Sequence, residues 1–198
     1  LADQDGISGD ITYVWKRNNI AITGATNSKY TLVQADVGST ITVTASYTDG
    51  HNNPHSVTSA ETSAVANVDD NPTGSVTITG TPTENVELTA SNTLADQDGI
   101  SGDITYAWSN GKTGVTITLE QADVGNKITV TASYTDGQGN THSKASAETS
   151  AVANINDSPS GEVTITGTPT ENQELTASND LADQDGISGD ITYVWKRN

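Results

Sequence analysis

The chain has 198 residues, of which 25 are Asp or Glu and only 8 are Lys or Arg, so its formal net charge is -17 at pH 7. This balance argues strongly against a nucleic-acid-binding protein, because phosphates need cationic partners. Disulfides are excluded because the chain has no cysteine, and no apolar run is long enough to span a membrane.

One block of sequence occurs three times along the chain. It is LADQDGISGDITYVW at residues 1–15, LADQDGISGDITYAW at 94–108 and the first form again at 181–195. The chain is therefore a tandem array in which long and short units alternate. We expect three domains: 1–70 as an immunoglobulin-like repeat lacking its first two strands, 71–158 as a complete repeat, and 159–198 as the first three strands of a further repeat.

Short runs of Val, Ile, Thr and Tyr, separated by Gly, Asn, Asp and Pro, predict strands and no helices. In the first repeat the clearest strand is 41–49, where apolar and hydroxyl side chains alternate between a core face and a solvent face. In the complete repeat we expect strands at 75–79, 87–91, 104–108, 115–119, 127–135 and 142–152, the last broken near Glu148. The pattern predicts an all-β fold of tandem immunoglobulin-like, cadherin-like β-sandwiches in an extended array.

Each of the three blocks ends in a tryptophan, at Trp15, Trp108 and Trp195. A tryptophan on the third strand, packed between two sheets, is typical of the immunoglobulin fold, so we favour a core position over a platform that stacks on sugars. The missing parts of the first and third repeats are complementary. We therefore expect either a window on a longer periodic array or ends that neighbouring molecules complete.

The acidic loop in each block has the spacing D-x-D-G-x-x-x-D. Carboxylates two residues apart on a Gly-containing loop can both face a hard cation, which takes six to eight oxygens. We predict that these loops bind calcium, the alternative being a solvated acidic turn. Their candidate ligands are Asp3, Asp5, Asp10, Asp96, Asp98, Asp103, Asp183, Asp185 and Asp190.

Other acids converge on the same junctions in a sandwich of this type. They lie in the TPTEN turn, the QADVG corner and the linkers between repeats, at Glu84, Glu171, Asp36, Asp123, Asp69, Asp70 and Asp157. Asp49 and Asp136, in the TDG turn, would lie at the same end as the acidic loops. Because close anions repel unless a cation binds, we predict that Ca²⁺ occupies each junction.

Several phrases carry a resemblance to known families. The junction is similar to that of cadherins, although Pro82, Thr83 and Glu84 include one residue more than the Pro-Glu turn of that family. The phrases VTITGTPTENQELTASN, QADVGSTITVTASYTDG and AVANINDSPSG resemble repeats of giant bacterial RTX-type surface adhesins.

This resemblance covers the whole chain and implies an extracellular, cell-surface location. It further implies extender domains, made rigid by calcium, that project a distal ligand-binding domain from the cell. Partners would then be the neighbouring repeats of the same chain, with no nucleic acid, no membrane insertion in this segment, and an adhesion ligand bound by another domain.

Other readings are weaker. His51, His55 and His142 lie around the turn after the Tyr-containing strand, and we expect a solvated loop there because the HNNPH pair is not repeated in DGQGNTH. We expect no enzyme, since there is no Ser-His-Asp or Cys-His set and no phosphate loop. The alternative function is an adhesive module that binds carbohydrate, ice or a partner protein through its strand faces, which exposed aromatic residues would favour.

Overall fold

The computed structural model describes residues 2–197, so the expected domain limits at residues 1 and 198 lie outside the described part. Within it, the chain forms β-strands and two short 3-10 helices, which confirms the prediction of an all-β protein. No helix in this part is long and apolar enough to cross a membrane. By its contacts the chain divides into two compact units, Leu1–Pro72 with Ala95–Ser101 and Thr135–His142, and Thr73–Leu94 with Gly102–Tyr134 and Ser143–Asn198.

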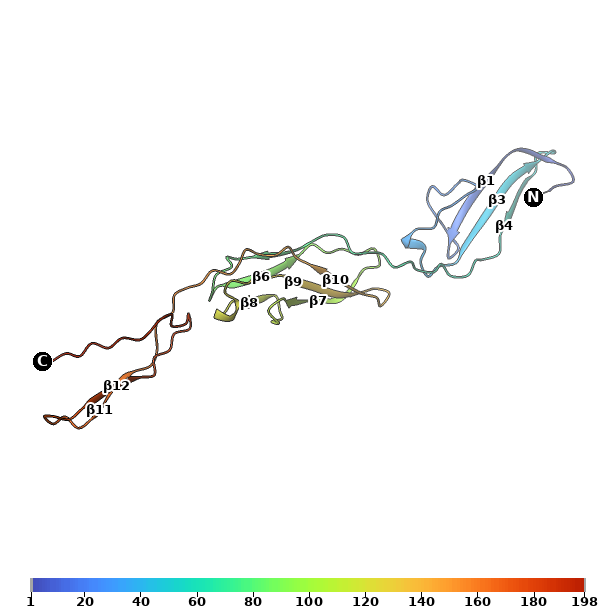
Figure 1. Cartoon of the computed structure of the whole chain (residues 1–198). Coiled ribbons are helices and arrows are strands. Elements are labelled where there is room, and N and C mark those ends of the chain that lie inside the picture. Colours follow the sequence, from blue (N-terminus) through green and yellow to red (C-terminus); the bar gives the residue numbers. More distant parts are fainter. Residues whose placement is uncertain (1, 198) are drawn as a thin grey trace. The chain divides into compact units, whose positions relative to one another are not determined.

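The first repeat forms one antiparallel sheet (Figure 1). Its order is β2-β1-β3-β4, with β1 at Ile7–Arg17, β2 at Ile20–Ala21, β3 at Ile41–Asp49 and β4 at Pro54–Thr58. The expected strand at 41–49 is confirmed, and its register places Trp15 opposite Val43. A 3-10 helix at Gln34–Asp36 forms the QADVG corner.

The second repeat has two three-stranded sheets. One has the order β5-β6-β8, with β5 at Val76–Thr79, β6 at Glu87–Asn92 and β8 at Thr116–Thr118. The other has the order β10-β9-β7, with β7 at Ile100–Trp108, β9 at Val130–Asp136 and β10 at Thr141–Ala145. Two sheets with buried side chains from both are consistent with a β-sandwich.

Three strand limits differ by more than one residue from those expected. β7 begins at Ile100 rather than at 104, β9 begins at Val130 rather than at 127, and β10 ends at Ala145. Beyond β10 the hydroxyl of Ser146 accepts the N–H of Val130, and that of Thr149 accepts the N–H of Ile128. These side chains take the place of carbonyl groups, so the regular backbone ladder stops there.

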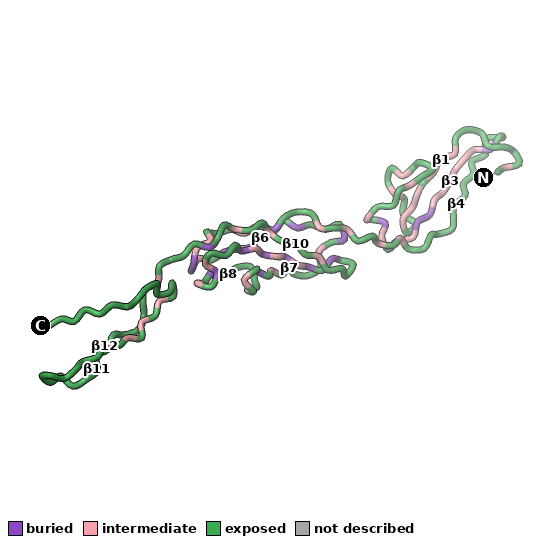
Figure 2. The backbone as a smooth tube through the Cα atoms, in the orientation of Figure 1, coloured by how far each residue is buried: buried purple, intermediate pink, exposed green. Residues whose placement is uncertain are grey.

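The core lies in the second repeat (Figure 2). Its fully buried side chains include Leu88, Leu119, Ile128 and Val130, and Trp108 is only 4% exposed. The indole N–H of Trp108 donates to the carbonyl of Gly114 at 2.9 Å, so burial leaves no unsatisfied donor. The prediction that Trp108 packs in the core is confirmed.

The third repeat has one hairpin, with β11 at Val163–Gly167 and β12 at Leu175–Asn179. The residues that follow repeat the sequence of β1, yet they form no strand, and Trp195 is 53% exposed. The expected core position of Trp195 is therefore not realised in this chain. β1 has β3 as its hydrogen-bonding partner, whereas 181–197 has no equivalent of β3 among the described residues.

Leu88 and Leu175 are a matched pair, because each follows the glutamate of an ELTASN segment, but Leu88 is fully buried and Leu175 is 37% exposed. We expect Leu88→Ala to lower the free energy of unfolding by about 2–5 kcal/mol, the usual cost of a cavity in a packed core. Leu175→Ala should have a much smaller effect in dilute protein. Urea unfolding followed by circular dichroism measures both, and equal losses would contradict the placement of the core.

Candidate metal centres

Among residues 2–197, two groups of three side chains bring possible metal ligands together. The first acidic group is Asp69, Asp136 and His142, and the second acidic group is Glu84, Asp157 and Asp185. In each group one ligand atom per residue lies within 4.8 Å of the others. Four of these six residues were predicted as metal ligands from the sequence; Asp136 was expected only at the same end of the repeat, and His142 was expected in solvent.

The second acidic group joins a turn, a linker and an acidic loop. Glu84, in the turn before β6, is 2% exposed, and its Oε2 accepts the N–H of Ile155 at 3.1 Å. The N–H of Asp157 donates to Oδ2 of Asp185 at 2.8 Å. This N–H is the main cause of the lowered pKa of Asp185, and the side chains of Asn154 and Gln121 lower it further. Burial raises this pKa, but by less than these groups lower it.

Carboxylate oxygens converge in the second acidic group. The side-chain amide of Gln121 reaches both carboxylate oxygens of Glu84, and with its NH₂ group turned toward them it donates at 2.9 and 3.0 Å. In addition, Oδ2 of Asp157 is buried without a hydrogen-bond partner. A cation between these oxygens would satisfy all of them at once.

The first acidic group lies around the TDG turn that follows β9. The amide of Asn140 donates to Asp69 at 2.8 Å and to Asp136 at 2.9 Å. The His142 side chain is 8% exposed, and its Nε2 is 3.3 Å from Asp69, 3.6 Å from Asp136 and 3.8 Å from Asp96. Burial raises the pKa of Asp136, but donors on Asn140, Gln138 and His142 outweigh burial and lower this pKa to about 2.

The same contact ties each linker to the acidic loop after it. In the first unit the N–H of Asp70 donates to Oδ2 of Asp98 at 3.0 Å, as Asp157 does to Asp185 in the second unit. Gln34 donates to Oδ1 of Asp98 at 2.7 Å. Asp70 and Asp157 correspond under the 87-residue spacing that relates Asp36 to Asp123. The linker and the loop therefore have one geometry at both junctions.

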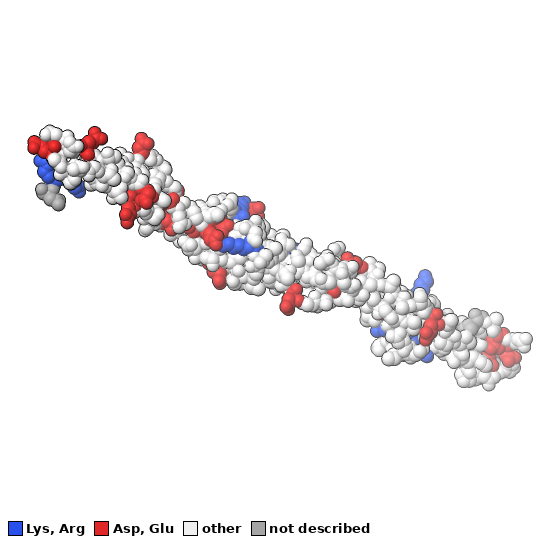
Figure 3. All heavy atoms as spheres, turned by 90° about the horizontal axis from the view of Figure 1, so that it is seen from below, with Lys and Arg blue, Asp and Glu red and all other residues white. Residues whose placement is uncertain are grey.

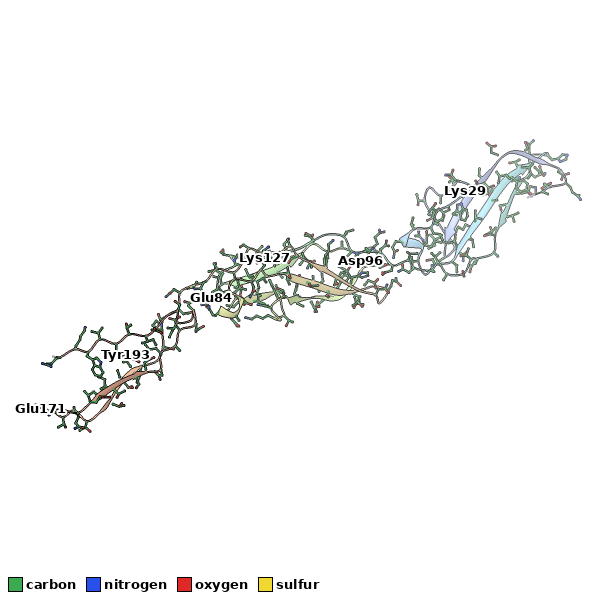
Figure 4. The ribbon with its side chains drawn as sticks, in the orientation of Figure 1. Lys29, Glu84, Asp96, Lys127, Glu171 and Tyr193 are labelled. Atoms are coloured by element: carbon green, nitrogen blue, oxygen red, sulfur yellow. The ribbon has the colours of Figure 1, made fainter. Side chains whose placement is uncertain are left out.

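A glycine holds the acidic loop against the TDG turn. The N–H of Gly137 donates to the carbonyl of Asp98 at 3.1 Å, and a Cβ on Gly137 would lie 2.3 Å from that oxygen. Gly50 approaches the carbonyl of Asp5 in the same way. Only glycine permits this approach. Figure 4 labels Asp96, which lies in the same acidic loop as Asp98. It also labels Glu84, the turn residue of the second acidic group.

The corner aspartates have other partners. Asp36 is fully buried and accepts from Arg17 at 2.7 Å, Tyr30 at 2.9 Å and the N–H of Val33 at 2.8 Å. Burial raises its pKa, but these donors outweigh burial and lower it. In the second repeat the corner Asp123 accepts from Asn110 and from the N–H of Glu120. Both residues therefore cap a 3-10 helix, and neither belongs to the two metal groups found among the described residues.

The remaining predicted ligands are outside both groups. The third acid of each loop, Asp10, Asp103 or Asp190, is exposed, because the strand has already begun at Asp10 and Asp103. The first acid orders its own loop: Asp3 accepts from the Tyr47 hydroxyl and from the N–H of Asp5, and Asp183 accepts from the N–H of Asp185. Glu171 is exposed in the turn between β11 and β12 (Figure 4).

The burial of His142 corrects the expectation of a solvated loop, which holds for His51, whose side chain is 72% exposed. A signal for it was present in the sequence. Asp49 to His55 and Asp136 to His142 share the pattern D-G-x-x-N-x-H, in which Asn53 or Asn140 donates to the aspartate. The number of histidines differs between the two turns, but the six-residue spacing from aspartate to histidine is the same.

Acidic side chains predominate over basic ones on the face drawn in Figure 3, as the composition requires.

Comparisons of the chain with protein-family models, with curated proteins and with solved structures find no match.

Asp49 should make stability depend on pH. The backbone N–H and side-chain amide of Asn53, with smaller contributions from His55 and His51, lower its pKa to about 2, despite burial. In the unfolded chain the pKa of an Asp is about 3.9. The ionised Asp49 therefore stabilises the folded state fully above that pH, and this contribution is lost as the pH falls through about 2. We expect Asp49→Asn to reduce the dependence of unfolding on pH in this window, without metal present. Urea midpoints between neutral and acid pH measure this, and an unchanged profile would contradict it.

Proposed function

We propose that the chain is a calcium-binding structural spacer, in which Ca²⁺ ties each linker to the repeats on either side of it. The observation that carries this proposal is the convergence of the carboxylates of Glu84, Asp157 and Asp185, together with the buried Oδ2 of Asp157, which has no hydrogen-bond partner. Carboxylates brought this close repel one another, and a cation between them offsets that repulsion.

The donor chemistry favours calcium in the second acidic group. Its side-chain ligand atoms are carboxylate oxygens from a turn, a linker and a loop, at Glu84, Asp157 and Asp185. Calcium takes 6–8 oxygens in flexible geometry, whereas magnesium requires a nearly ideal octahedron at shorter distances. Segments from three places in the chain suit the more permissive ion.

The two acidic groups support one composite junction. The second acidic group includes the turn acid Glu84, for which the first repeat has no counterpart in the chain. The first acidic group includes Asp136 and His142 from the TDG turn, for which the third repeat has none. Asp157 of the second acidic group corresponds to Asp70, the residue that follows Asp69 of the first acidic group. A junction between two complete repeats would therefore contain both groups, separated only by adjacent linker residues.

A cation in this position has a mechanical effect. A short linker such as AVANINDSPSG has free backbone dihedrals, and an ion that binds linker, turn and loop together removes that freedom. The ion also offsets part of the net charge of -17. We infer that the array is rigid at millimolar calcium and flexible without it. We place it outside the cell, at the surface of a bacterium. There it would project a distal domain that binds the adhesion ligand.

The structure offers little for direct adhesion by the repeats. The exposed aromatic residues Tyr193 and Trp195 correspond to Tyr106 and Trp108, which face the interior of the second repeat. Their exposure reflects an open core rather than a flat platform for sugars or ice. We therefore retain the spacer as the proposed function.

Glu84 and Glu171 provide a matched test of calcium binding, since both lie in the sequence VTITGTPTEN but only Glu84 is buried beside other ligands. We expect Glu84→Gln to weaken calcium binding in isothermal titration calorimetry, and Glu171→Gln to leave it unchanged in dilute protein. Calcium at a hundredfold excess over Kd should add about 2.7 kcal/mol to the free energy of unfolding. No calcium uptake by the unmodified chain would overturn the site.

Small-angle X-ray scattering tests the mechanical role, with data extrapolated to zero concentration. We expect calcium, but not magnesium, to increase the maximum dimension and to narrow the distribution of shapes, because it removes freedom at the linkers. The Glu84→Gln variant is the control for a general effect of ionic strength. Identical profiles with and without calcium would rule out a stiffening role even if calcium binds.

A further inference from the structure

The corner aspartate is buried in both the first and the second repeat, but its partners differ. Asp36 forms an ion pair with Arg17, whose Nε and terminal nitrogen lie 2.7 and 2.6 Å from its Oδ1. Asp123 corresponds to Asp36 and is 6% exposed. It accepts the side-chain amide of Asn110 at 3.1 Å and the N–H of Glu120 at 2.9 Å. Both of these donors are neutral, so the second repeat holds its corner carboxylate without the cation that the first repeat uses.

Asn110 takes the place of Arg17 in the second repeat. Each is the second residue after the tryptophan of its block. The strand register agrees: Arg17 lies opposite Ile41, and Asn110 follows Ser109, whose N–H donates to the carbonyl of the residue after Ile128. Ile41 and Ile128 correspond under the 87-residue spacing. An asparagine side chain is much shorter than that of arginine, so the path that arginine follows to the corner aspartate is only partly filled.

A pocket lies at this place. It is lined by Ser109, Asn110 and residues of the segment 122–128, with Asp123 among them. Lys127 also lines it, but its ammonium group is 3.0 Å from Glu148 and no ion pair joins it to Asp123 in the described part of the chain. The pocket therefore offers a buried carboxylate that no cation of the chain neutralises.

We propose that this pocket binds a guanidinium group from outside the chain, in the position that the Arg17 side chain takes beside Asp36. A buried carboxylate is stabilised by a cation that also donates hydrogen bonds to it. The guanidinium group is planar and donates in a fixed fork that fits a carboxylate. Ser109 and Asn126 line the same pocket, and their side-chain oxygens can accept further N–H groups.

Two sources share this chemistry, namely the arginine side chain of a peptide or protein and a small free guanidine. The net charge of -17 attracts cations of either kind. Calcium binding at the junctions is a separate matter, because the residues that line the pocket belong to neither acidic group. The site can therefore be measured with a calcium chelator present, and its failure would leave the spacer proposal untouched.

Titration of the full chain with methylguanidinium, followed by NMR with a calcium chelator present, tests the site. We expect saturable shifts of the backbone amide signals of Glu120 and Asp123 and of the side-chain amide of Asn110. Methylurea has a similar shape without the charge and should cause none of these shifts. The absence of saturable shifts at Asp123 with methylguanidinium would overturn the proposal, and so would equal shifts with methylurea.

The first repeat provides an internal control in the same sample. Arg17 already occupies the position beside Asp36, so the amide signals of Val33 and Asp36 should not respond to methylguanidinium. Equal responses at Asp36 and Asp123 would indicate general attraction to acidic residues and would contradict a built site.

Two variants change the pocket from within the chain. Asn110→Arg should fill it, so the response of Asp123 to methylguanidinium should be lost and the urea midpoint of unfolding should rise. Lys127→Ala leaves Asp123 and its two donors in place and should bind methylguanidinium more tightly, because a neighbouring positive charge is removed. Unchanged binding by Asn110→Arg, or weaker binding by Lys127→Ala, would count against the site.

N-acetylarginine amide distinguishes the two sources. If it shifts the signals of Asp123 as methylguanidinium does, the pocket accepts an arginine side chain attached to a backbone. If methylguanidinium alone does so, the pocket accepts a small free guanidine.

Discussion

Closure of a sandwich around its core is the constraint on which the rest of this structure depends. Each sheet has only one apolar face, so a repeat buries its side chains only when the second sheet is present. The second repeat has both sheets and buries Trp108, Leu88 and Leu119. The flanking repeats have parts of the same sequence and leave the corresponding residues partly or largely exposed. A repeat in this chain therefore buries its tryptophan and leucines fully only where both sheets are present.

The acidic residues play two roles that the sequence does not separate. Asp36, Asp123 and Asp49 are satisfied by donors of their own repeat and stabilise corners and turns. Those of the second acidic group converge on one another, and Oδ2 of Asp157 is buried without a hydrogen-bond partner. Only the latter arrangement calls for a metal ion, and it occurs where linker, turn and loop meet. The spacer proposal depends on this distinction rather than on the number of acids.

Much of the candidate site could be predicted from spacing. Glu84, Asp69, Asp157 and Asp185 were found because turns, linkers and loops of consecutive repeats must meet at a junction. The corner Asp36 was assigned the same role, but Arg17 reaches it from β1, a pairing across 19 residues that no local pattern indicates. His142 was not predicted as a ligand because Asp69, 3.3 Å from it, belongs to the linker that precedes the repeat of His142 and is remote from it in sequence.

Residues 1–18 and 181–198 have identical sequences and show where sequence information ends. Composition, alternation and repetition by themselves determined the class of fold, the limits of β3 and the presence of acidic junctions, because these depend on neighbouring residues. Whether a given copy becomes a strand, and whether its tryptophan is buried, was decided by the tertiary structure. β1 exists because β3 lies beside it, and its twin at the other end of the chain has no such partner among the described residues. A strand is stabilised by hydrogen bonds to another strand, and that partner is remote in sequence.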